Sequence, residues 1–394
     1  MNSIKTGIAT LITSAITSKS YPLPADFDID EAYKTIKRHH ITTLAYVGAV
    51  NCGVPKTAES MQQMFRRYFE EIEKSDRQQK EIRILCDIFE QNGIDYMCLK
   101  GANMKQFYPA PELRKMGDVD ILVRESDYPR VEKILESLDY QNISKYDHHL
   151  SWTKNKVLFE IHIRVMSRWI KYYSYFGDGW QRAKNLSGHC YVMSPEDEYI
   201  FLFIHFVKHY CISGIGFRHI TDLWVFRKSH PELDDNYISN ELEKLNLVEF
   251  HKNVLQTVSV MFDNQQPTEA TEIISDFIFN SGSWGTLTSK SVAKGAELKV
   301  KNSSKSARLQ MILYVFFLPY SGMRVTYPIL EKYPVLLPFY WVKRAFDVLR
   351  LRRKNVGMRF KEISRTTPER VTAYESAMKK IGLDYTISEN FKGA

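Results

Sequence analysis

The sequence predicts an α+β fold in which a small mixed β-sheet is flanked by N-terminal and C-terminal helical regions. Three observations support this prediction. Apolar residues recur at three- and four-residue spacing through most of the first 92 residues, strand-like runs then alternate with short helical stretches, and helical periodicity returns afterwards. The predicted regions are an N-terminal helical region (1–92), an α/β core (93–190), a helical domain (191–280) and a basic, mostly helical C-terminal region (281–394).

The first predicted region consists of helices. Residues 8–16 are apolar but interrupted by hydroxyl side chains, which favours a small amphipathic helix over a secretory signal core. The stretches 29–53 and 60–92 place apolar residues at helical spacing amid charged ones. Gly93 then ends the second stretch, because glycine commonly follows the last helical turn.

The core region reads as alternating strands and helices. Short apolar or alternating runs rich in Val, Ile and Phe indicate strands, and glycines, prolines and asparagines separate them. The predicted elements are a strand over 94–99, a brief helical stretch after the turn Lys100–Asn103, a strand over 118–123, a helix over 127–138, and a hairpin of 149–154 with 157–165 that turns at Asn155–Lys156.

Helix start signals organise the remainder of the chain. Ser194 followed by Pro195 and two acidic residues is typical of a helix N-terminus, and helices are expected from there to about Leu247. The polar, Gly/Ser/Lys-rich stretch 281–306 predicts a loop. A last helix is expected to begin at Thr367–Pro368 and to stop at Gly382.

The composition excludes several classes and leaves others open. With 394 residues, 44% hydrophobic and 25% charged, the chain is neither collagen-like, low-complexity nor wholly disordered. The net charge is +8, but residues 290–361 hold sixteen Lys and Arg against three acids, so this segment carries +13 and the rest −5. The segment interleaves with aromatic residues and ends in the run 350–354. It therefore fits a polyanionic acceptor, an anionic membrane surface, or a helical subdomain with a solvated basic face.

Cysteine usage and hydropathy bear on location. The five cysteines are an odd number without C-x-x-C spacing, which fits a reducing cytosol. The longest strongly apolar run, 311–318, is far shorter than the ~20 residues that span a bilayer. We therefore expect a cytoplasmic protein without a transmembrane segment, peripheral membrane association being the alternative.

Three acidic residues form the candidate catalytic constellation. Asp118 and Asp120 lie at i and i+2 of a strand, so both carboxylates project from one face while the intervening apolar residues face a core. Adjacent carboxylates repel unless a cation lies between them, and Mg²⁺ prefers carboxylate and phosphate oxygens. Glu160 occupies the polar face of an otherwise apolar strand. A third carboxylate would complete a two-ion site for phosphoryl chemistry.

A glycine turn supplies a second part of the constellation. Gly101 follows the 94–99 strand and precedes a helical stretch, which allows backbone N–H groups to approach phosphate. The chain has no P-loop motif and no Gly-x-Ser-x-Gly elbow, so those enzyme classes are disfavoured.

The glycine turn and the acidic strands together resemble the motifs of a known enzyme family. The runs Cys98-Leu99-Lys100-Gly101, Arg114 to Val123 and Phe159-Glu160-Ile161-His162 resemble poorly characterised bacterial nucleotidyltransferases of the DNA-polymerase-β-like superfamily. The resemblance implies transfer of a nucleoside monophosphate from a nucleoside triphosphate to an acceptor, with two Mg²⁺ ions and release of pyrophosphate. The implied acceptor is a small molecule, a saccharide or a lipid-linked intermediate.

The resemblance also assigns roles residue by residue. Asp118 and Asp120 correspond to the shared metal ligands, Glu160 to the third carboxylate and base, and Gly101 to the phosphate turn. Ala102 stands where the superfamily often has a hydroxyl donor to the triphosphate. The candidate replacements for that contact are Lys100 and Arg114, and the candidate triphosphate or acceptor face on a later helix is His205, Lys208 and His209.

Other interpretations remain open. The chain could modify a protein or tRNA, or it could be a non-catalytic nucleotide-binding or scaffold protein, which the alanine at 102 favours. Glu160 could pair with His162 as a structural group, and Gly101 could be a plain turn residue.

The histidines and one charge pair have their own alternatives. His205 and His209 suit helix packing as well as phosphate contact, and zinc is disfavoured because no third ligand is obvious. Arg218 and Asp222 are spaced for an intrahelical ion pair. His148–His149 is expected at the surface.

Overall fold

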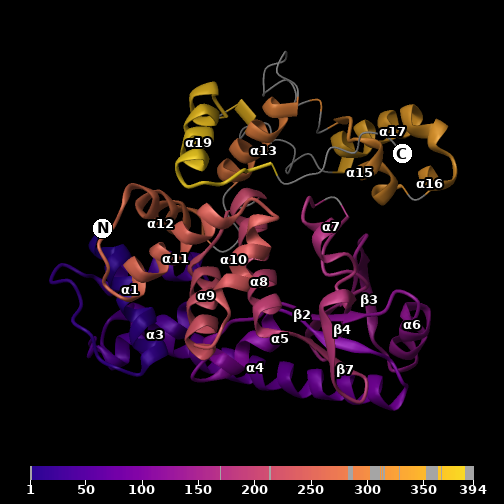
Figure 1. Ribbon diagram of the computed structural model, residues 1–394. Helices are drawn as coiled ribbons and strands as arrows, with labels where there is room; N and C mark the ends of the chain where they lie inside the picture. The colour runs from indigo at the N-terminus through magenta and orange to yellow at the C-terminus, as the bar shows by residue number, and fades with distance from the viewer. Residues whose placement is uncertain are drawn as a thin grey trace.

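A seven-stranded mixed sheet forms the centre of the computed structural model and confirms the α+β fold class (Figure 1). The strand order is β3-β4-β5-β2-β1-β7-β6, in which β2 runs parallel to β5 and β1 parallel to β7, while the other neighbours are antiparallel. The strands are β1 (Tyr96–Cys98), β2 (Val119–Val123), β3 (Gln141–Lys145), β4 (His149–Lys154), β5 (Val157–His162), β6 (Ala183–Ser187) and β7 (Cys190–Met193).

The structure describes most of the chain, and every structural statement below refers to that part. The described residues are 2–168, 170–212, 214–282, 287–301, 311, 313, 316–327, 329–351, 363–364 and 366–386. Part of the basic segment, including residues 352–354 of the terminal basic run, lies outside them.

The predicted hairpin is confirmed at β4–β5. Asn155 and Lys156 both have positive φ (49° and 62°), the backbone of a two-residue turn whose twist matches paired strands. β5 ends at His162, three residues before the predicted end. The sequence reading missed β3, β6 and β7. β3 and β6 are the two edge strands and are largely exposed, so they lack the apolar alternation that marks a half-buried strand.

Four helices precede the sheet: α1 (Ser3–Thr17), α2 (Ile29–Arg38), α3 (Thr42–Asn51) and α4 (Glu59–Gln91). The long helix predicted over 60–92 is confirmed as α4. The single stretch predicted over 29–53 is wrong, because the chain breaks at His40, whose φ is +52°. A residue with that backbone cannot continue a right-handed helix.

The sheet separates two hydrophobic layers. Val119, Ile121 and Val123 of β2, with Phe159 and Ile161 of β5, face a cluster completed by α4 and by α6 (Tyr128–Ser137). Figure 1 shows α4 running along this side of the sheet. The alternate residues of β2 and β5 face the opposite side, toward the later helices. The strand periodicity therefore places the acidic residues away from the apolar layer, as predicted.

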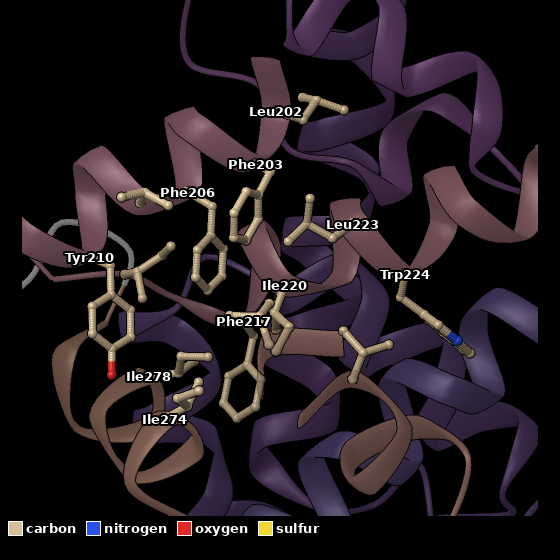
Figure 2. Packing of buried hydrophobic residues seen from close by; sticks show 14 of the residues in the cluster. Leu202, Phe203, Phe206, Tyr210, Phe217, Ile220, Leu223, Trp224, Ile274 and Ile278 are labelled. Carbon is tan, nitrogen blue, oxygen red and sulfur yellow. The ribbon is translucent and has the colours of Figure 1, made fainter. Parts of the chain in front are cut away.

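The helical domain packs over that second side. Ser194 begins α8 as predicted, since its Oγ accepts a hydrogen bond from the Asp197 backbone N–H (3.2 Å). Figure 2 shows how aromatic and aliphatic side chains of α8, α9 and α12 interdigitate, with Phe203, Phe206 and Phe217 fully buried. The helices are α8 (Pro195–Ile212), α9 (Phe217–Ser229), α10 (Asp235–Glu243), α11 (Val248–Phe262) and α12 (Glu269–Ser281).

The C-terminal region corrects one prediction. Residues 281–306 were expected to form a loop, but α13 (Leu287–Lys301) is a helix within them. Its apolar residues Val292, Ala293 and Ala296 are buried in the main hydrophobic cluster together with residues of α19 (Pro368–Lys380), so tertiary packing overrides a polar composition. Thr367 caps α19 as predicted, its hydroxyl accepting from the Arg370 N–H (3.3 Å).

The remaining elements are short or lie in the same region: α5 (Gly101–Met104), α7 (Tyr173–Phe176), α15 (Tyr320–Thr326), α16 (Ile329–Lys332), α17 (Leu337–Leu351), and 3₁₀ turns η1 (Lys105–Phe107), η2 (Pro111–Leu113), η3 (Trp180–Arg182) and η4 (Pro334–Leu336). Among the described helices, none is both long and apolar enough to cross a membrane.

Candidate active site

A polar cavity of about 330 Å³ lies between the acidic face of the sheet and the helices α8 and α9. One wall comes from β2, β4 and β5, the other from the two helices, and the turn after β1 closes the end. Six of the chain's eleven histidines line this cavity. Of the residues predicted for the site, all but Ala102 line it as well: Lys100, Gly101, Arg114, Asp118, Asp120, Glu160, His205, Lys208 and His209.

The strand register brings the predicted acids together. β2 and β5 are parallel neighbours, and Asp120 is the register partner of Glu160. Residues opposite each other on adjacent strands project to the same face. Asp118 lies immediately before β2 on the same side as Asp120 and lines the same cavity. Three carboxylates, the first and last of them 42 positions apart in sequence, therefore share one wall.

Asp120 is the most tightly held of the three. Its Oδ1 accepts from Lys100 Nζ (2.7 Å) and lies 2.8 Å from His162 Nε2, and its carboxylate is buried. Burial favours the neutral form, but the positive charge of Lys100 and the His162 contact hold the pKa of Asp120 well below its ordinary value. In return Asp120 raises the pKa of Lys100 despite burial of the ammonium. Asp120 is therefore ionised at neutral pH.

Glu160 lies between two imidazoles. Its Oε1 is 3.4 Å from His149 Nε2 and its Oε2 is 3.5 Å from His162 Nε2. Burial opposes its charge, yet hydrogen bonding to His162 lowers the pKa of Glu160. The Glu160–His162 pairing considered from the sequence is present, and the same imidazole also contacts Asp120. His162 thus orients both register partners.

The His148–His149 pair is not a surface feature, contrary to expectation. His149 is only 7% exposed, its Nδ1 lies 3.2 Å from His148 Nε2, and both rings line the cavity. Burial, and then the neighbouring His162, lowers the pKa of His149 to about 3, so this imidazole is neutral. His149 is the first residue of β4 and directly follows His148, and the antiparallel register sets His149 opposite His162.

Asp118 is the carboxylate with the most unfavourable surroundings. Burial, followed by the negative charges of Asp120 and Glu160, raises its pKa. A cation bound beside it would relieve both effects. The donor set of three carboxylates fits a hard divalent ion such as Mg²⁺, and one ligand atom each of Asp120, Glu160 and His162 lie within 4.8 Å of one another.

The turn after β1 is strained and tightly packed. Lys100 has φ +45° and ψ −111°, a conformation rarely adopted by a side-chain-bearing residue. A Cβ on Gly101 would lie 2.7 Å from Arg114 Nη1 and 2.8 Å from Met116 Sδ, so only glycine fits without displacement. Ala102 packs against the hydrophobic layer beneath the sheet, and its N–H donates to the Leu99 carbonyl (3.3 Å).

Arg114 has a partner that the sequence did not indicate. Its Nε and Nη2 donate to the two oxygens of Asp222 (3.0 and 2.9 Å), and the Tyr108 hydroxyl donates to the same carboxylate (2.7 Å). Asp222 therefore does not form the predicted ion pair with Arg218, whose Nη1 donates to the Lys115 carbonyl (3.2 Å) instead. The buried Arg114–Asp222 pair joins the turn region to α9.

Lys208 and Arg218 form the cationic wall opposite the acids. Burial, and then the charge of Lys100, lowers the pKa of Lys208 to about 8. Burial, and then Arg114, lowers the pKa of Arg218, and its buried Nε has no hydrogen-bond partner among the described residues. Neither side chain forms an ion pair within the part of the chain described. Half-buried cations without an ion-pair partner are costly, which makes this wall suited to an anion.

Three histidines meet beside this wall. His205 and His209 lie one turn apart on α8, and His219 of α9 joins them, with one ligand atom of each within 4.8 Å of the others. Burial first, then neighbouring charges, lowers the pKa of each well below the usual range, so the rings are neutral. The sequence disfavours zinc because no third ligand is obvious beside His205 and His209. The structure places His219 there as a third imidazole, so that reason does not hold. No spacing rule could supply His219, because a loop reverses the chain between the two helices.

Comparison with known proteins gives one match. A family model described as an uncharacterised nucleotidyltransferase matches residues 25–263, which is more than half of the chain and includes every residue of the cavity. The chain matches no curated protein and no solved structure at a significant level.

Proposed function

Because the chain belongs to this family of uncharacterised nucleotidyltransferases, we propose that it transfers a nucleoside monophosphate from a nucleoside triphosphate to an acceptor hydroxyl, with Mg²⁺ and release of pyrophosphate. One observation carries the proposal: Asp120 and Glu160 on adjacent parallel strands, with Asp118 just before the first of them, face two cations without ion-pair partners among the described residues across a single cavity. Nucleotide transfer needs carboxylates that bind a metal ion and cations that bind the triphosphate, and this cavity offers both kinds of group.

The proposed reaction is a substitution at phosphorus. The acceptor oxygen bonds to the α-phosphorus, the bond from that phosphorus to the β-bridging oxygen breaks, and pyrophosphate leaves. Glu160 is ionised and lines the cavity, so its carboxylate is placed to accept the hydroxyl hydrogen bond and take the proton as the oxygen becomes bonded. His162, held between Glu160 and Asp120, fixes the direction of both carboxylates.

The carboxylates also define where a metal would bind. Asp118, Asp120 and Glu160 are the residues that would hold Mg²⁺, which would neutralise charge on the phosphates and acidify the attacking hydroxyl. Lys100 and His162 keep Asp120 ionised and therefore ready to bind a cation. The pKa of Asp118 is raised, so protons compete with a metal ion for its carboxylate. Metal affinity should therefore decrease as the pH is lowered.

The opposite wall is assigned to the triphosphate. Lys208 and Arg218 are the cations available there, and the neutral rings of His205 and His209 can donate hydrogen bonds to phosphate oxygens. Arg114 donates through Nε and Nη2 to both oxygens of Asp222, so we assign it a positioning role behind Gly101. Ala102 brings no polar group to the cavity, and Lys100 is its nearest cationic replacement.

The test is pyrophosphate release from each nucleoside triphosphate with Mg²⁺ and a panel of candidate acceptors. Asp118→Asn and Asp120→Asn should each abolish turnover. The thermal midpoint should stay near that of the parent in Asp118→Asn, whereas Asp120→Asn leaves Lys100 without its ion pair and is therefore assayed well below its own midpoint. Asp139→Asn is the matched control, because Asp139 is exposed and has φ +60°, a backbone that asparagine tolerates. Full turnover in Asp120→Asn would refute the proposal.

Two further measurements separate the remaining alternatives. Calorimetry that detects nucleotide binding with Mg²⁺ but no pyrophosphate over hours would identify a non-catalytic nucleotide-binding protein. Mass spectrometry of the acceptors shows which class gains the nucleotide mass, and a product formed only on protein or tRNA would replace the small-molecule, saccharide and lipid-linked acceptors.

A further inference from the structure

The C-terminal region presents a row of large apolar side chains to solvent. Phe339, Val342 and Phe346 of α17 are 66%, 71% and 61% exposed, and Val335 just before the helix is 83% exposed. Spacings of three and four residues place the three α17 side chains on one face of the helix. Contiguous exposed apolar surface of this kind marks an interaction site.

The other face of α17 is packed, so the helix is held with its apolar row outward. Trp341 Nε1 donates to the Leu318 carbonyl (2.8 Å), and the rings of Tyr340 and Tyr327 lie 4.9 Å apart. Figure 1 shows α15, α16 and α17 grouped at one end of the molecule, away from the sheet that bears the acids. The exposed row is therefore a surface of its own and not part of the cavity.

Basic residues share the exposed face. Lys343 and Arg350 are exposed, and their positions at i+4 and i+11 from Phe339 place them within the same helical stripe. The acidic Asp347 is half-buried, accepts a hydrogen bond from the Tyr327 hydroxyl (3.1 Å) and pairs with Lys343 Nζ (3.3 Å), so the net positive charge of the stripe comes from Arg350. The stripe thus combines phenylalanine and valine with positive charge.

We propose that this face of α17, formed by Phe339, Val342, Lys343, Phe346 and Arg350, binds the surface of an anionic phospholipid bilayer. Apolar side chains would enter the boundary between headgroups and acyl chains, and the lysine and arginine would contact lipid phosphates. Long basic side chains suit this position because their stems lie along apolar surface while their charges stay in water.

The chemistry of the stripe favours lipid over nucleic acid. Single-stranded nucleic acid is bound by aromatic rings that stack on bases within a basic groove. Here a valine with no stacking face stands between the two phenylalanines, and the surface is an outward helix face. Such a surface would hold the chain at a membrane without crossing it, where a lipid-linked acceptor would be presented.

The test is co-sedimentation of the full chain with vesicles of phosphatidylcholine alone or mixed with phosphatidylglycerol. We expect binding to the anionic vesicles that weakens with salt. Replacing Phe339 and Phe346 by Ser should reduce the affinity on the order of tenfold for each residue. Lys343→Gln with Arg350→Gln should reduce it roughly fivefold for each charge, and only for anionic vesicles.

Phe65→Ser and Phe69→Ser are the matched controls, because these α4 side chains are 47% and 53% exposed on another surface. Equal binding by the α17 variants and the parent, or no binding by the parent at low salt, would overturn the proposal. Retention of RNA that depends on Lys343 and Arg350, without vesicle binding, would also overturn it. Pyrophosphate release with a soluble acceptor should be unchanged in the α17 variants, so failure here is distinguishable from failure of the catalytic proposal.

Discussion

If Lys208 binds the triphosphate as proposed, nucleotide binding should depend on pH. Its ammonium lies in the wall assigned to the triphosphate, and burial lowers its pKa to about 8. With that pKa, about nine-tenths of the side chain is protonated at pH 7 and about one-tenth at pH 9. If only the ammonium form binds the triphosphate well, the apparent affinity should fall roughly tenfold across this interval, which is about 1.4 kcal/mol.

The assay is calorimetric titration with a non-hydrolysable nucleoside triphosphate and Mg²⁺ at pH 7, 8 and 9. Lys208→Arg should bind at pH 7 and lose the pH dependence, because a guanidinium stays protonated throughout. Lys208→Gln should bind weakly at every pH. Lys228→Gln is the control, since Lys228 is exposed on α9 and stacks over Trp224. Equal affinity and an equal pH slope in the parent and in Lys208→Gln would refute the assignment.

Three further predictions concern groups around the acids. Gly101→Ala should destabilise the fold by about 1–3 kcal/mol in urea unfolding, because its Cβ would meet an Arg114 side chain that cannot move away. Asp222→Asn should cost about 3–5 kcal/mol in the same measurement, because it leaves the buried Arg114 uncompensated. Acidification from pH 5 to pH 3 should destabilise the parent more than Lys100→Met. The pKa of Asp120 in the folded chain lies below its ordinary value of 3.8, so the ionised carboxylate stabilises the fold at higher pH. This stabilisation is lost as the pH falls. Lys100→Met lacks the ion pair that lowers the pKa of Asp120, so it should lose less stability on acidification.

Matched substitutions control these predictions. A Cβ on Gly117 would have nothing within 4 Å, so Gly117→Ala should leave stability unchanged, and an equal loss in both glycine variants would contradict the packing argument. Asp263→Asn changes an exposed carboxylate at the end of α11 and should cost little. Parallel acid unfolding curves for the parent and Lys100→Met would show that the Lys100–Asp120 pair contributes nothing.

Much of the fold followed from local patterns. The period-two alternation around Asp120 and Glu160 predicted strands with acids on one face, and the structure confirms both strands and the apolar layer behind them. Capping residues at Ser194 and Thr367 located two helix starts. These signals succeed because strand pleating and helix capping depend on residues within a few positions of each other.

Local patterns failed where tertiary contacts decide. The edge strands β3 and β6 carry no buried alternation, and α13 is helical because its few apolar residues pack against α19. His40 interrupts a stretch whose apolar spacing is otherwise continuous. In each case the deciding contact or backbone conformation is absent from the pattern of neighbouring residue types.

The sequence by itself identified the candidate side chains for the proposed chemistry: the carboxylates of Asp118, Asp120 and Glu160, and the Lys208 face of a helix. Only the tertiary structure decided which of them meet. The parallel register of β2 and β5 sets Asp120 opposite Glu160, and the turn between α8 and α9 carries His219 to the other histidines. Residue type and spacing fix the direction of a side chain along one element, whereas the pairing of elements distant in sequence is fixed by packing of the whole chain.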